Sequence, residues 1–274
     1  MKIHGICLLK NEADIVDYSL RENLRWCDFI YVYDNGSTDD SVDRVQAMAR
    51  QDSRIIPSGA CTKPFADNLR ADVYNRFKER AAPGDWWCRL DADEIYVDDV
   101  RGFLARVPPS QHFVWSIYLQ YYPTEKDLAR LEACEGQPPY NVTAENLPRY
   151  YFADYAEPKF FRHRPGLRWD TGSWPIHVGL TVPEMLRHKH IQYRSPAQIE
   201  FRLQTRREAT AQGSLGFPNS TEKSWREKVL PSAGLHFDAG DNRYIVETAR
   251  LPRHLEPAWQ RLIKCVMHGA GIWP

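Results

Sequence analysis

Short apolar runs alternate with helically spaced apolar residues along the first third of the chain. The run from Ile3 to Leu9 has the length of a buried strand, and apolar residues at helical spacing follow it between Val16 and Cys27. The same alternation continues, and it predicts strands at 29–33, 54–57 and 86–90 and helices at 42–49, 69–77 and 100–107. Strands that alternate with helices predict a largely parallel sheet that is covered by helices on both faces.

The pattern changes after about residue 112. Phe113 to Tyr122 is one more strand-like run, and residues 123–175 are rich in Pro, Tyr and Arg and indicate long loops with antiparallel strands. We expect a helix to begin after Ser195, because Ser caps helices and Gln198 completes a capping box. Near the end of the chain, Trp259 to Trp273 fits either a packed terminal helix or an aromatic and basic stretch that attaches to a membrane surface.

Length and composition narrow the class of protein. With 274 residues the chain fits one α/β domain, and we expect a single domain spanning 1–274. Lys+Arg and Asp+Glu are both 36, so the formal charge is +0. Proteins that bind nucleic acid by its charge carry a basic excess, so we expect no nucleic-acid partner.

Three further features bear on location. The 6 cysteines form no CxxC pair, which indicates reduced thiols and neither a zinc site nor a disulfide framework. The longest uncharged aromatic run is far shorter than the roughly 18 apolar residues of a membrane span. The start of the chain lacks the features of a secretory signal. We therefore expect a cytoplasmic protein with at most peripheral contact with the inner face of the membrane.

Two acidic motifs follow predicted strands. One is Asp34-Asn35-Gly36-Ser37 and the other is Asp91-Ala92-Asp93-Glu94. Ligands of open α/β sheets bind at the carboxyl ends of the strands, where both motifs fall. If strand geometry persists, alternate residues place Asp91 and Asp93 on the same side. Two close carboxylates repel each other unless a cation such as Mg²⁺ or Mn²⁺ binds, so this motif predicts a site for a metal and a diphosphate.

Calcium and zinc sites fit the sequence less well. A helix–loop–helix calcium site needs Gly at its sixth position and Glu at its twelfth, and neither motif has them. A zinc site at His188 and His190 with His177 or His236 has no supporting local spacing. An acidic loop without a ligand remains an alternative for the second motif.

The motifs together resemble a known family. Lys10 to Asp14 (KNEAD), Tyr33 to Asp39 (YDNGSTD) and Leu90 to Glu94 (LDADE) occur in this order and spacing. The chain is similar in this to glycosyltransferases of family 2 with the GT-A fold, in the branch with KNE and DADE motifs. The segment from His190 to Ser195 (HIQYRS) also resembles that branch. The resemblance covers about residues 1–120 and parts of 150–210.

The resemblance implies a fold. It is a GT-A type, Rossmann-like, mixed but mostly parallel sheet flanked by helices, with a more irregular C-terminal half. Residues 1–120 would form the half that binds the nucleotide-sugar, and residues 121–274 would form the acceptor-binding half with the C-terminal helices.

The resemblance also implies site residues. The loop after the first strand would line the nucleotide, and Asp34 or Asn35 would pair with the base or ribose. Asp93 would be the direct ligand of Mn²⁺ or Mg²⁺, Asp91 would contact the ribose or a metal-bound water, and His190 would complete the metal shell, with His188 as its alternative. The residues of that first loop are Leu8, Leu9, Lys10, Asn11 and Glu12.

Basic residues follow the predicted metal ligands. Arg194 and Arg202 come after His190 and are expected to reach the phosphates, where positive charge stabilises the leaving group. Arg206 fits a solvated helix face equally well. His190 itself fits a core or loop histidine about as well as a metal ligand.

An inverting transferase needs a general base near the anomeric carbon, usually a carboxylate. The candidates are Asp154, Glu157 and Asp170, and we favour Asp170, then Glu157. Asp170 lies between Trp169 and Trp174, whose indole faces suit stacking on a sugar ring, although core aromatics in a loop explain them as well. Lys159 and His177 are further residues expected near the site, and a retaining mechanism stays open.

These features predict a metal-dependent glycosyltransferase. It would move a sugar from a nucleotide-sugar, with a UDP-sugar favoured, to a hydroxyl of a glycan or glycolipid in polysaccharide biosynthesis. Two alternatives remain open. One is an inactive carbohydrate- or nucleotide-binding scaffold of the same fold. The other is a sugar-nucleotide nucleotidyltransferase, which would need a Gly-rich phosphate loop that Ile3 to Asn11 does not contain.

Overall fold

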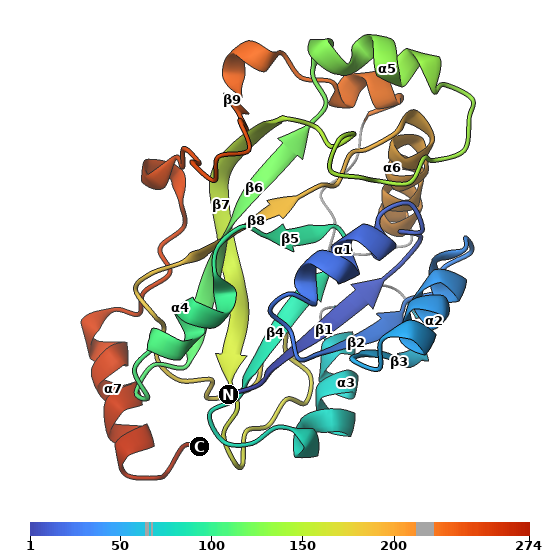
Figure 1. The fold of residues 1–274 in the computed structure, drawn as a ribbon. Coiled ribbons are helices and arrows are strands. Elements are labelled where there is room, and N and C mark those ends of the chain that lie inside the picture. Colours follow the sequence, from blue (N-terminus) through green and yellow to red (C-terminus); the bar gives the residue numbers. More distant parts are fainter. Residues whose placement is uncertain (64–65, 67, 212–221) are drawn as a thin grey trace.

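One mixed sheet runs through the molecule. The computed structural model describes residues 1–63, 66, 68–211 and 222–274. The sheet has nine strands in the order β3-β2-β1-β4-β7-β6-β8-β5, with β9 beside β7 (Figure 1). The strands are β1 (Ile3–Leu9), β2 (Phe29–Asp34), β3 (Ile55–Ala60), β4 (Trp86–Asp91), β5 (Glu94–Tyr96), β6 (Phe113–Tyr122), β7 (Tyr150–Arg162), β8 (Leu186–His190) and β9 (His236–Phe237).

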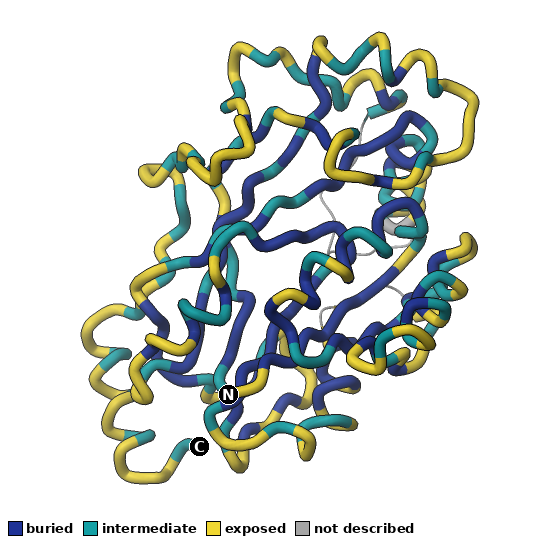
Figure 2. The backbone as a smooth tube through the Cα atoms, viewed as in Figure 1, coloured by how far each residue is buried: buried dark blue, intermediate teal, exposed yellow. Residues whose placement is uncertain are grey.

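Helices cover both faces of the parallel part, formed by β1 to β4. Alternate side chains of β1 point to opposite faces, so Ile3, Cys7 and Leu9 belong to one core cluster and Ile6 and Leu8 to another. The first cluster includes residues of α1, α2 and α4, and the second includes residues of α3. This two-sided burial explains why β1 is apolar almost throughout (Figure 2). The helices are α1 (Val16–Asn23), α2 (Ser41–Gln51), α3 (Leu69–Phe77) and α4 (Val100–Arg106).

The second half of the chain adds strands in both directions. The long strand β7 is antiparallel to both β4 and β6, and it joins the two halves into one sheet. Strand β8 is parallel to β6, and the short β5 is antiparallel to β8. In that last ladder His190 lies opposite Glu94, so a residue of the second half is placed beside the Asp91–Glu94 motif.

The remaining helices lie at the edges of the sheet. Helix α6 begins after Ser195 as predicted, and the Ser195 hydroxyl accepts a hydrogen bond from the Gln198 backbone N–H at 3.3 Å. The Gln198 side chain accepts from the N–H of Arg194, one residue before the expected capping partner. The other elements are α5 (Leu128–Ala133), α6 (Pro196–Ala211), α7 (Ala258–Gly269) and the short 3₁₀ turns Lys78–Arg80, Glu125–Asp127, Trp225–Lys228, Ser232–Gly234 and Thr248–Arg250.

The terminal helix α7 has an unusual orientation. Its polar residue Lys264 faces the protein and donates to Glu256 at 2.6 Å and to the Gly179 carbonyl at 2.8 Å. Its apolar side chains face outward, with Trp259 62% and Leu262 65% exposed. It lies at the end of the sheet near the N-terminus, away from α6 (Figure 1). None of the helices in the described ranges combines the length and the apolar character that a membrane crossing requires.

The predicted fold class, an α/β sheet flanked by helices with a more irregular second half, is confirmed. The strand from Phe113 to Tyr122 has the predicted bounds. The short strands β5, β8 and β9 were not predicted, because β8 (LRHKH) is mostly charged and the other two are very short. The chain also turns at residues 92–93, so strand geometry does not continue from Asp91 to Asp93 as expected.

A close packing contact tests this fold. Gly179 has a φ of +97°, and a Cβ added there would overlap the buried ring of His112. Gly84 has a similar φ of +92°, but a Cβ there would meet nothing within 4 Å. We expect Gly84→Ala to cost about 1–2 kcal/mol of unfolding free energy through backbone strain. Gly179→Ala should cost a further 1–3 kcal/mol, roughly, through overpacking.

Urea unfolding of the two variants and the wild type measures both losses. Equal losses for the two variants would show that the His112 ring moves aside at no cost, contrary to this expectation.

Candidate active site

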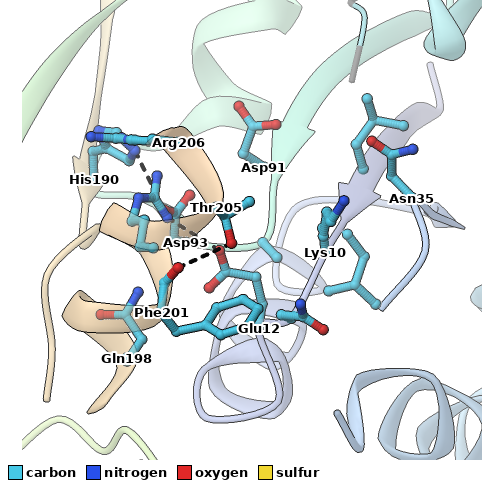
Figure 3. A pocket seen from close by; sticks show the side chains of 15 residues that line it. Lys10, Glu12, Asn35, Asp91, Asp93, His190, Gln198, Phe201, Thr205 and Arg206 are labelled. Atoms are coloured by element: carbon cyan, nitrogen blue, oxygen red, sulfur yellow. Dashed lines mark hydrogen bonds and ion pairs between the residues drawn. The ribbon is translucent and has the colours of Figure 1, made fainter. Parts of the chain in front are cut away.

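A cavity of about 260 Å³ opens at the carboxyl ends of β1 and β4 and is lined on one side by α6 (Figure 3). Its walls come from the loop after β1, the turn after β4 and the segment from β8 into α6. Most of the predicted site residues line it. They are Leu8, Leu9, Lys10, Asn11, Glu12, Asn35, Asp91, Asp93, His190, Arg202 and Arg206.

Hydrogen bonds join the loop after β1 to the turn after β2. Asn11 has a φ of +54°, a conformation that Asn adopts more easily than most residues. Its Oδ1 accepts from the Thr38 N–H at 2.6 Å, and its own N–H donates to the Ser37 hydroxyl at 2.9 Å. The N–H of Glu12 donates to the Ser41 hydroxyl at 2.8 Å. The first two motifs therefore hold each other in place, while Lys10 and Glu12 line the cavity.

Asp34 and Asn35 have different roles in the structure. The carboxylate of Asp34 accepts from the backbone N–H groups of Gly36 and Ser37 at 3.0 and 3.1 Å, so it stabilises the turn. Asp34 is not among the cavity-lining residues, whereas Asn35 is. The Asn35 amide donates to the Lys63 carbonyl at 2.8 Å, and its buried Oδ1 has no hydrogen-bond partner among the described residues. Within the described ranges, Asn35 thus has an unpaired, buried acceptor in the wall of the cavity.

The charge of Asp91 is balanced inside the protein. Its Oδ1 accepts from the guanidinium of Arg70, and its Oδ2 lies 3.4 Å from Lys159 Nζ. Both cations are fully buried. Lys159 also lies 2.6 Å from a carboxylate oxygen of Glu94 and 3.0 Å from one of Glu157. Burial alone would lower the pKa of Lys159, but the charges of Glu94, Glu157 and Asp91 raise it, so the ammonium stays charged.

Asp93 has different ionic partners from Asp91. Its Oδ2 lies 3.3 Å from Arg202 Nη1 and 3.5 Å from His190 Nε2. Burial alone would raise the pKa of Asp93, but the charges of His190, Arg202 and Arg194 bring it well below its usual range. Asp93 is therefore a carboxylate at neutral pH, although it is buried.

The structure distinguishes between the two candidate histidines. His190 lines the cavity, and the N–H of the next residue, Ile191, donates to the Asp93 carbonyl at 2.9 Å. His188 is fully buried two residues earlier, with its Nε2 3.4 Å from Glu94, and does not line the cavity. His177 stacks on Trp273 instead and is also not a lining residue.

Asp93 and His190 suit a divalent cation that arrives with phosphate. In the part of the chain that the structure describes, no group of three or more His, Cys, Asp or Glu side chains forms a ready metal site. The carboxylate of Asp93 and the Nε2 of His190 nevertheless converge at 3.5 Å. Mg²⁺ at nucleotide sites is typically held by one or two protein ligands, with phosphate oxygens and water in the other positions. The residues therefore fit a metal that shares its shell with a diphosphate.

Arg194 serves a structural role in this geometry. Its fully buried guanidinium donates to both oxygens of Asp14 at 2.6 and 2.8 Å and to Glu12 at 2.5 Å. It does not line the cavity, where it was expected to meet phosphate. Arg206, for which a solvated helix face was an equal possibility, does line it.

Sequence reasoning missed several other lining residues on α6. They share one face of the helix with Arg202, since they recur at intervals of three and four, so helical periodicity from the predicted start of α6 is the signal that reveals them. They are Gln198, Phe201 and Thr205.

The two favoured carboxylates for the general base lie outside the cavity lining. Asp170 is exposed and pairs with Arg168 at 2.8 Å. Glu157 accepts from the Tyr118 hydroxyl at 2.5 Å and lies 3.0 Å from Lys159 Nζ.

Of the two alternatives for Trp169 and Trp174, a sugar-stacking wall or core aromatics in a loop, the structure supports the core for Trp169. Trp169 is fully buried, edge-on to Phe161 and tilted against Tyr74, because it closes the core beneath α3. Trp174 is half-buried, and the Arg89 guanidinium lies 4.6 Å from its ring. Trp169 is therefore a core residue and is not available to a substrate.

Comparison with known proteins gives only distant similarities. No protein-family model matches the sequence, and no curated protein matches it. Among solved structures, a mannosyltransferase from Pyrobaculum calidifontis in complex with GDP-Man and Mn²⁺ is 13% identical with a TM-score of 0.42, over 79% of this chain and 66% of that one. S. aureus TarS 1–349 is 11% identical with a TM-score of 0.36, over 80% of this chain and 67% of that one.

A third solved structure, GalNAc-T7 with UDP, GalNAc and Mn²⁺, is 13% identical with a TM-score of 0.39, over 71% of this chain and 44% of that one. The chain thus spans just under two thirds of the mannosyltransferase and less than half of GalNAc-T7. The first of these structures is a mannosyltransferase by name. With TM-scores below 0.5, the similarities carry no inference about the chemistry of this chain.

We expect Glu157 to stabilise the fold at neutral pH and to lose this effect in acid. Burial opposes its ionisation, but the charges of Lys159 and Arg89 and the hydrogen bond from Tyr118 lower its pKa from 4.5 to about 2. Because the pKa is lower in the folded state, the stabilisation is complete above about pH 4.5 and disappears as the pH falls towards 2. It amounts to at most about 3.5 kcal/mol, at about 1.4 kcal/mol for each of the 2.5 pH units between the two pKa values.

Urea unfolding between pH 7 and 3 compares the wild type with Glu157→Gln. The difference in unfolding free energy should be largest at pH 7 and shrink below pH 4.5. Asp170→Asn, at an exposed carboxyl, is the control and should change stability by less than about 0.5 kcal/mol throughout. A difference between wild type and Glu157→Gln that is independent of pH would contradict the expectation.

Proposed function

We propose that this protein is a metal-dependent glycosyltransferase that uses a nucleotide-sugar donor, with a UDP-sugar favoured. One observation carries the proposal. A buried carboxylate, Asp93, and an imidazole, His190, converge in a cavity at the carboxyl ends of β1 and β4, beside the guanidinium of Arg202. This arrangement suits a metal-bound diphosphate, and ligands of open α/β sheets bind at this edge.

The cavity has separate groups for each part of such a donor. Lys10, Arg202 and Arg206 line it and supply positive charge for the phosphates. Asp93 and His190 would hold Mn²⁺ or Mg²⁺. The free Oδ1 of Asn35 would accept a hydrogen bond from an N–H of the base, such as the imino group of uracil.

Asp91 has a different role from Asp93 in this proposal. Its two oxygens already face Arg70 and Lys159, which are fully buried. A metal bound directly to Asp91 would place further positive charge against these two cations. We therefore assign Asp91 as a hydrogen-bond acceptor for a ribose hydroxyl or a metal-bound water, and Asp93 as the direct ligand.

The proposed sugar transfer places negative charge on the departing diphosphate, and the cavity supplies the positive charge that stabilises it. An acceptor hydroxyl of a glycan or glycolipid forms a bond to the anomeric carbon while the bond from that carbon to the diphosphate breaks. The bound metal would stabilise the negative charge on the departing diphosphate. Lys10, Arg202 and Arg206 add to this stabilisation, and the apolar side chains of Leu9 and Phe201 help to exclude water. We propose inversion of configuration, with residues 121–274 supplying the acceptor side in addition to the donor-site residues His190, Arg202 and Arg206.

A carboxylate base would take the proton of the acceptor hydroxyl. We propose Asp170 for this role, with Glu157 as the alternative. The low pKa of Glu157 makes it a weak base, because Lys159 stabilises its charge. Asp170 is exposed, and its partner Arg168 is an exposed side chain that an acceptor can displace.

Metal-dependent nucleotide binding tests the proposal directly. A ligand of the folded state raises the melting temperature by an amount that depends on its concentration relative to Kd. We expect UDP to raise the melting temperature only in the presence of Mn²⁺, and Asp93→Asn to abolish this shift. Asp241→Asn, at an exposed carboxyl outside the cavity lining, is the matched control and should keep the shift.

The same melting-temperature experiment is carried out with GDP and dTDP. A shift with GDP or dTDP in place of UDP would keep the mechanism and change the donor. No shift with any nucleoside diphosphate would contradict the proposal and favour a scaffold.

Turnover measurements test the assignment of Asp170 as the general base. If Asp170 takes the proton, Asp170→Asn should lower kcat by about 10²–10⁴-fold and leave the Mn²⁺-dependent shift with UDP unchanged. Release of UDP from a panel of UDP-sugars with glycan acceptors measures this. Normal turnover in Asp170→Asn, with a loss in Glu157→Gln, would transfer the role to Glu157.

A further inference from the structure

One cation bridges the loop after β1 and the Asp91–Glu94 motif at the cavity wall. Arg202 Nη1 lies 3.3 Å from the Oδ2 of Asp93 and 3.3 Å from the Oε1 of Glu12. Its Nε is buried and has no hydrogen-bond partner within the described ranges. The side chain is 22% exposed and lines the cavity. A single guanidinium nitrogen thus serves two carboxylates and uses little of its hydrogen-bonding capacity.

Arg202 is held more weakly than the other cations of this network. Arg194 has contacts of 2.5 to 2.8 Å with Glu12 and Asp14 and is fully buried. Lys159 has contacts of 2.6 and 3.0 Å with Glu94 and Glu157 and is also fully buried. If Arg202 moves, Glu12 keeps Arg194 as a partner, whereas Asp93 is left with its contact to His190.

Arg202 contacts the carboxylate oxygen of Asp93 that a metal would bind. The Oδ2 of Asp93 faces both Arg202 and the Nε2 of His190. A divalent cation bound between Asp93 and His190 would lie close to the Arg202 guanidinium, and two like charges at this distance repel each other. The guanidinium and the metal therefore compete for the same carboxylate.

The diphosphate of a donor removes this competition. A guanidinium matches phosphate oxygens with two parallel hydrogen bonds, which its single-nitrogen contact with Asp93 and Glu12 does not provide. Arg202 is on the cavity side of α6, so its flexible side chain reaches the space that the phosphates would occupy. Its movement to phosphate would leave Asp93 free for the metal.

We propose that Arg202 is an exchangeable internal cation that makes metal binding depend on the donor. Without a nucleotide, Arg202 neutralises Asp93 and Glu12. With a nucleotide, it binds the diphosphate, and Asp93 becomes free to bind the metal. Metal and nucleotide then bind with positive coupling, and each raises the affinity of the other by the same factor. This inference rests on the proposed function, since it assumes a metal-bound diphosphate in the cavity.

The chain offers a matched control. Arg206 is one helical turn further along α6 and also lines the cavity. Its guanidinium contacts two neutral groups, the Tyr193 hydroxyl at 3.2 Å and the Gln192 Oε1 at 3.3 Å. Arg206→Gln therefore removes the same charge from the same wall and leaves the contacts of Asp93 in place.

Titration calorimetry of Mn²⁺, alone and with saturating UDP or GDP, tests the inference. In the wild type we expect weak binding of Mn²⁺ alone and a large gain with the nucleotide. Arg202→Gln should bind Mn²⁺ alone more tightly, by about tenfold, and should lose most of the gain from the nucleotide. Arg206→Gln should bind Mn²⁺ alone with a smaller change than Arg202→Gln.

A second variant covers the case in which Arg202→Gln does not fold. Arg202→Lys keeps the positive charge beside Asp93 but loses the paired donors of the guanidinium. It should bind Mn²⁺ alone as weakly as the wild type and show a smaller gain from the nucleotide. A gain equal to that of the wild type would overturn the inference.

Failure of the inference and failure of the proposed function are distinguishable. If Mn²⁺ and nucleotide bind together but Arg202→Gln binds Mn²⁺ alone no more tightly than the wild type, the inference is overturned and the proposed function stands. If neither the wild type nor any variant binds a nucleotide with Mn²⁺, the proposed function fails and the inference fails with it.

Discussion

Carboxylates that are buried close together must be neutralised by cations of the same chain, and this constraint shapes the site. An isolated buried charge is very costly, and burial of a pair is tolerated only when the geometry satisfies both groups. Glu94 meets Lys159 from β7, Asp91 meets Arg70 from α3, and Asp14 meets Arg194 after β8. Strand β7, helix α3 and the segment after β8 therefore bring the cations that allow the acidic groups after β1 and β4 to pack inside the protein.

The same network gives two neighbouring aspartates different properties. Asp91 faces cations that are fully buried, whereas Asp93 faces His190 and a partly exposed arginine at the cavity. Environment, and not residue type, decides the behaviour of a carboxylate. The part of the network inside the protein holds the site in shape, and the part at the cavity wall is open to exchange with a ligand.

The sequence predicts the parallel half of the sheet and the position of the cavity, because both depend on short-range sequence patterns. Hydrophobic periodicity reports the strands and helices of residues 1–107, and the carboxyl ends of parallel strands meet at one edge, so Asn35, Asp91 and Asp93 are brought to one place. The partners of the carboxylates could not be predicted, since no local pattern links Arg70 or Lys159 to Asp91. The charged strand β8 was missed for the same reason, because its place in the sheet depends on tertiary packing.

The spacing of the charged partners along the chain has a consequence for synthesis. Glu12 and Arg194 are 182 residues apart, and Asp93 and Arg202 are 109 apart. A nascent chain that ends near residue 110 has the carboxylates of both motifs but neither of these arginines, and it has not yet made Lys159. Its acidic edge must stay hydrated until β7, β8 and α6 leave the ribosome. The N-terminal half therefore keeps an open acidic edge until residues 150–211 have been made, and long-range closure of this kind is intrinsically slow.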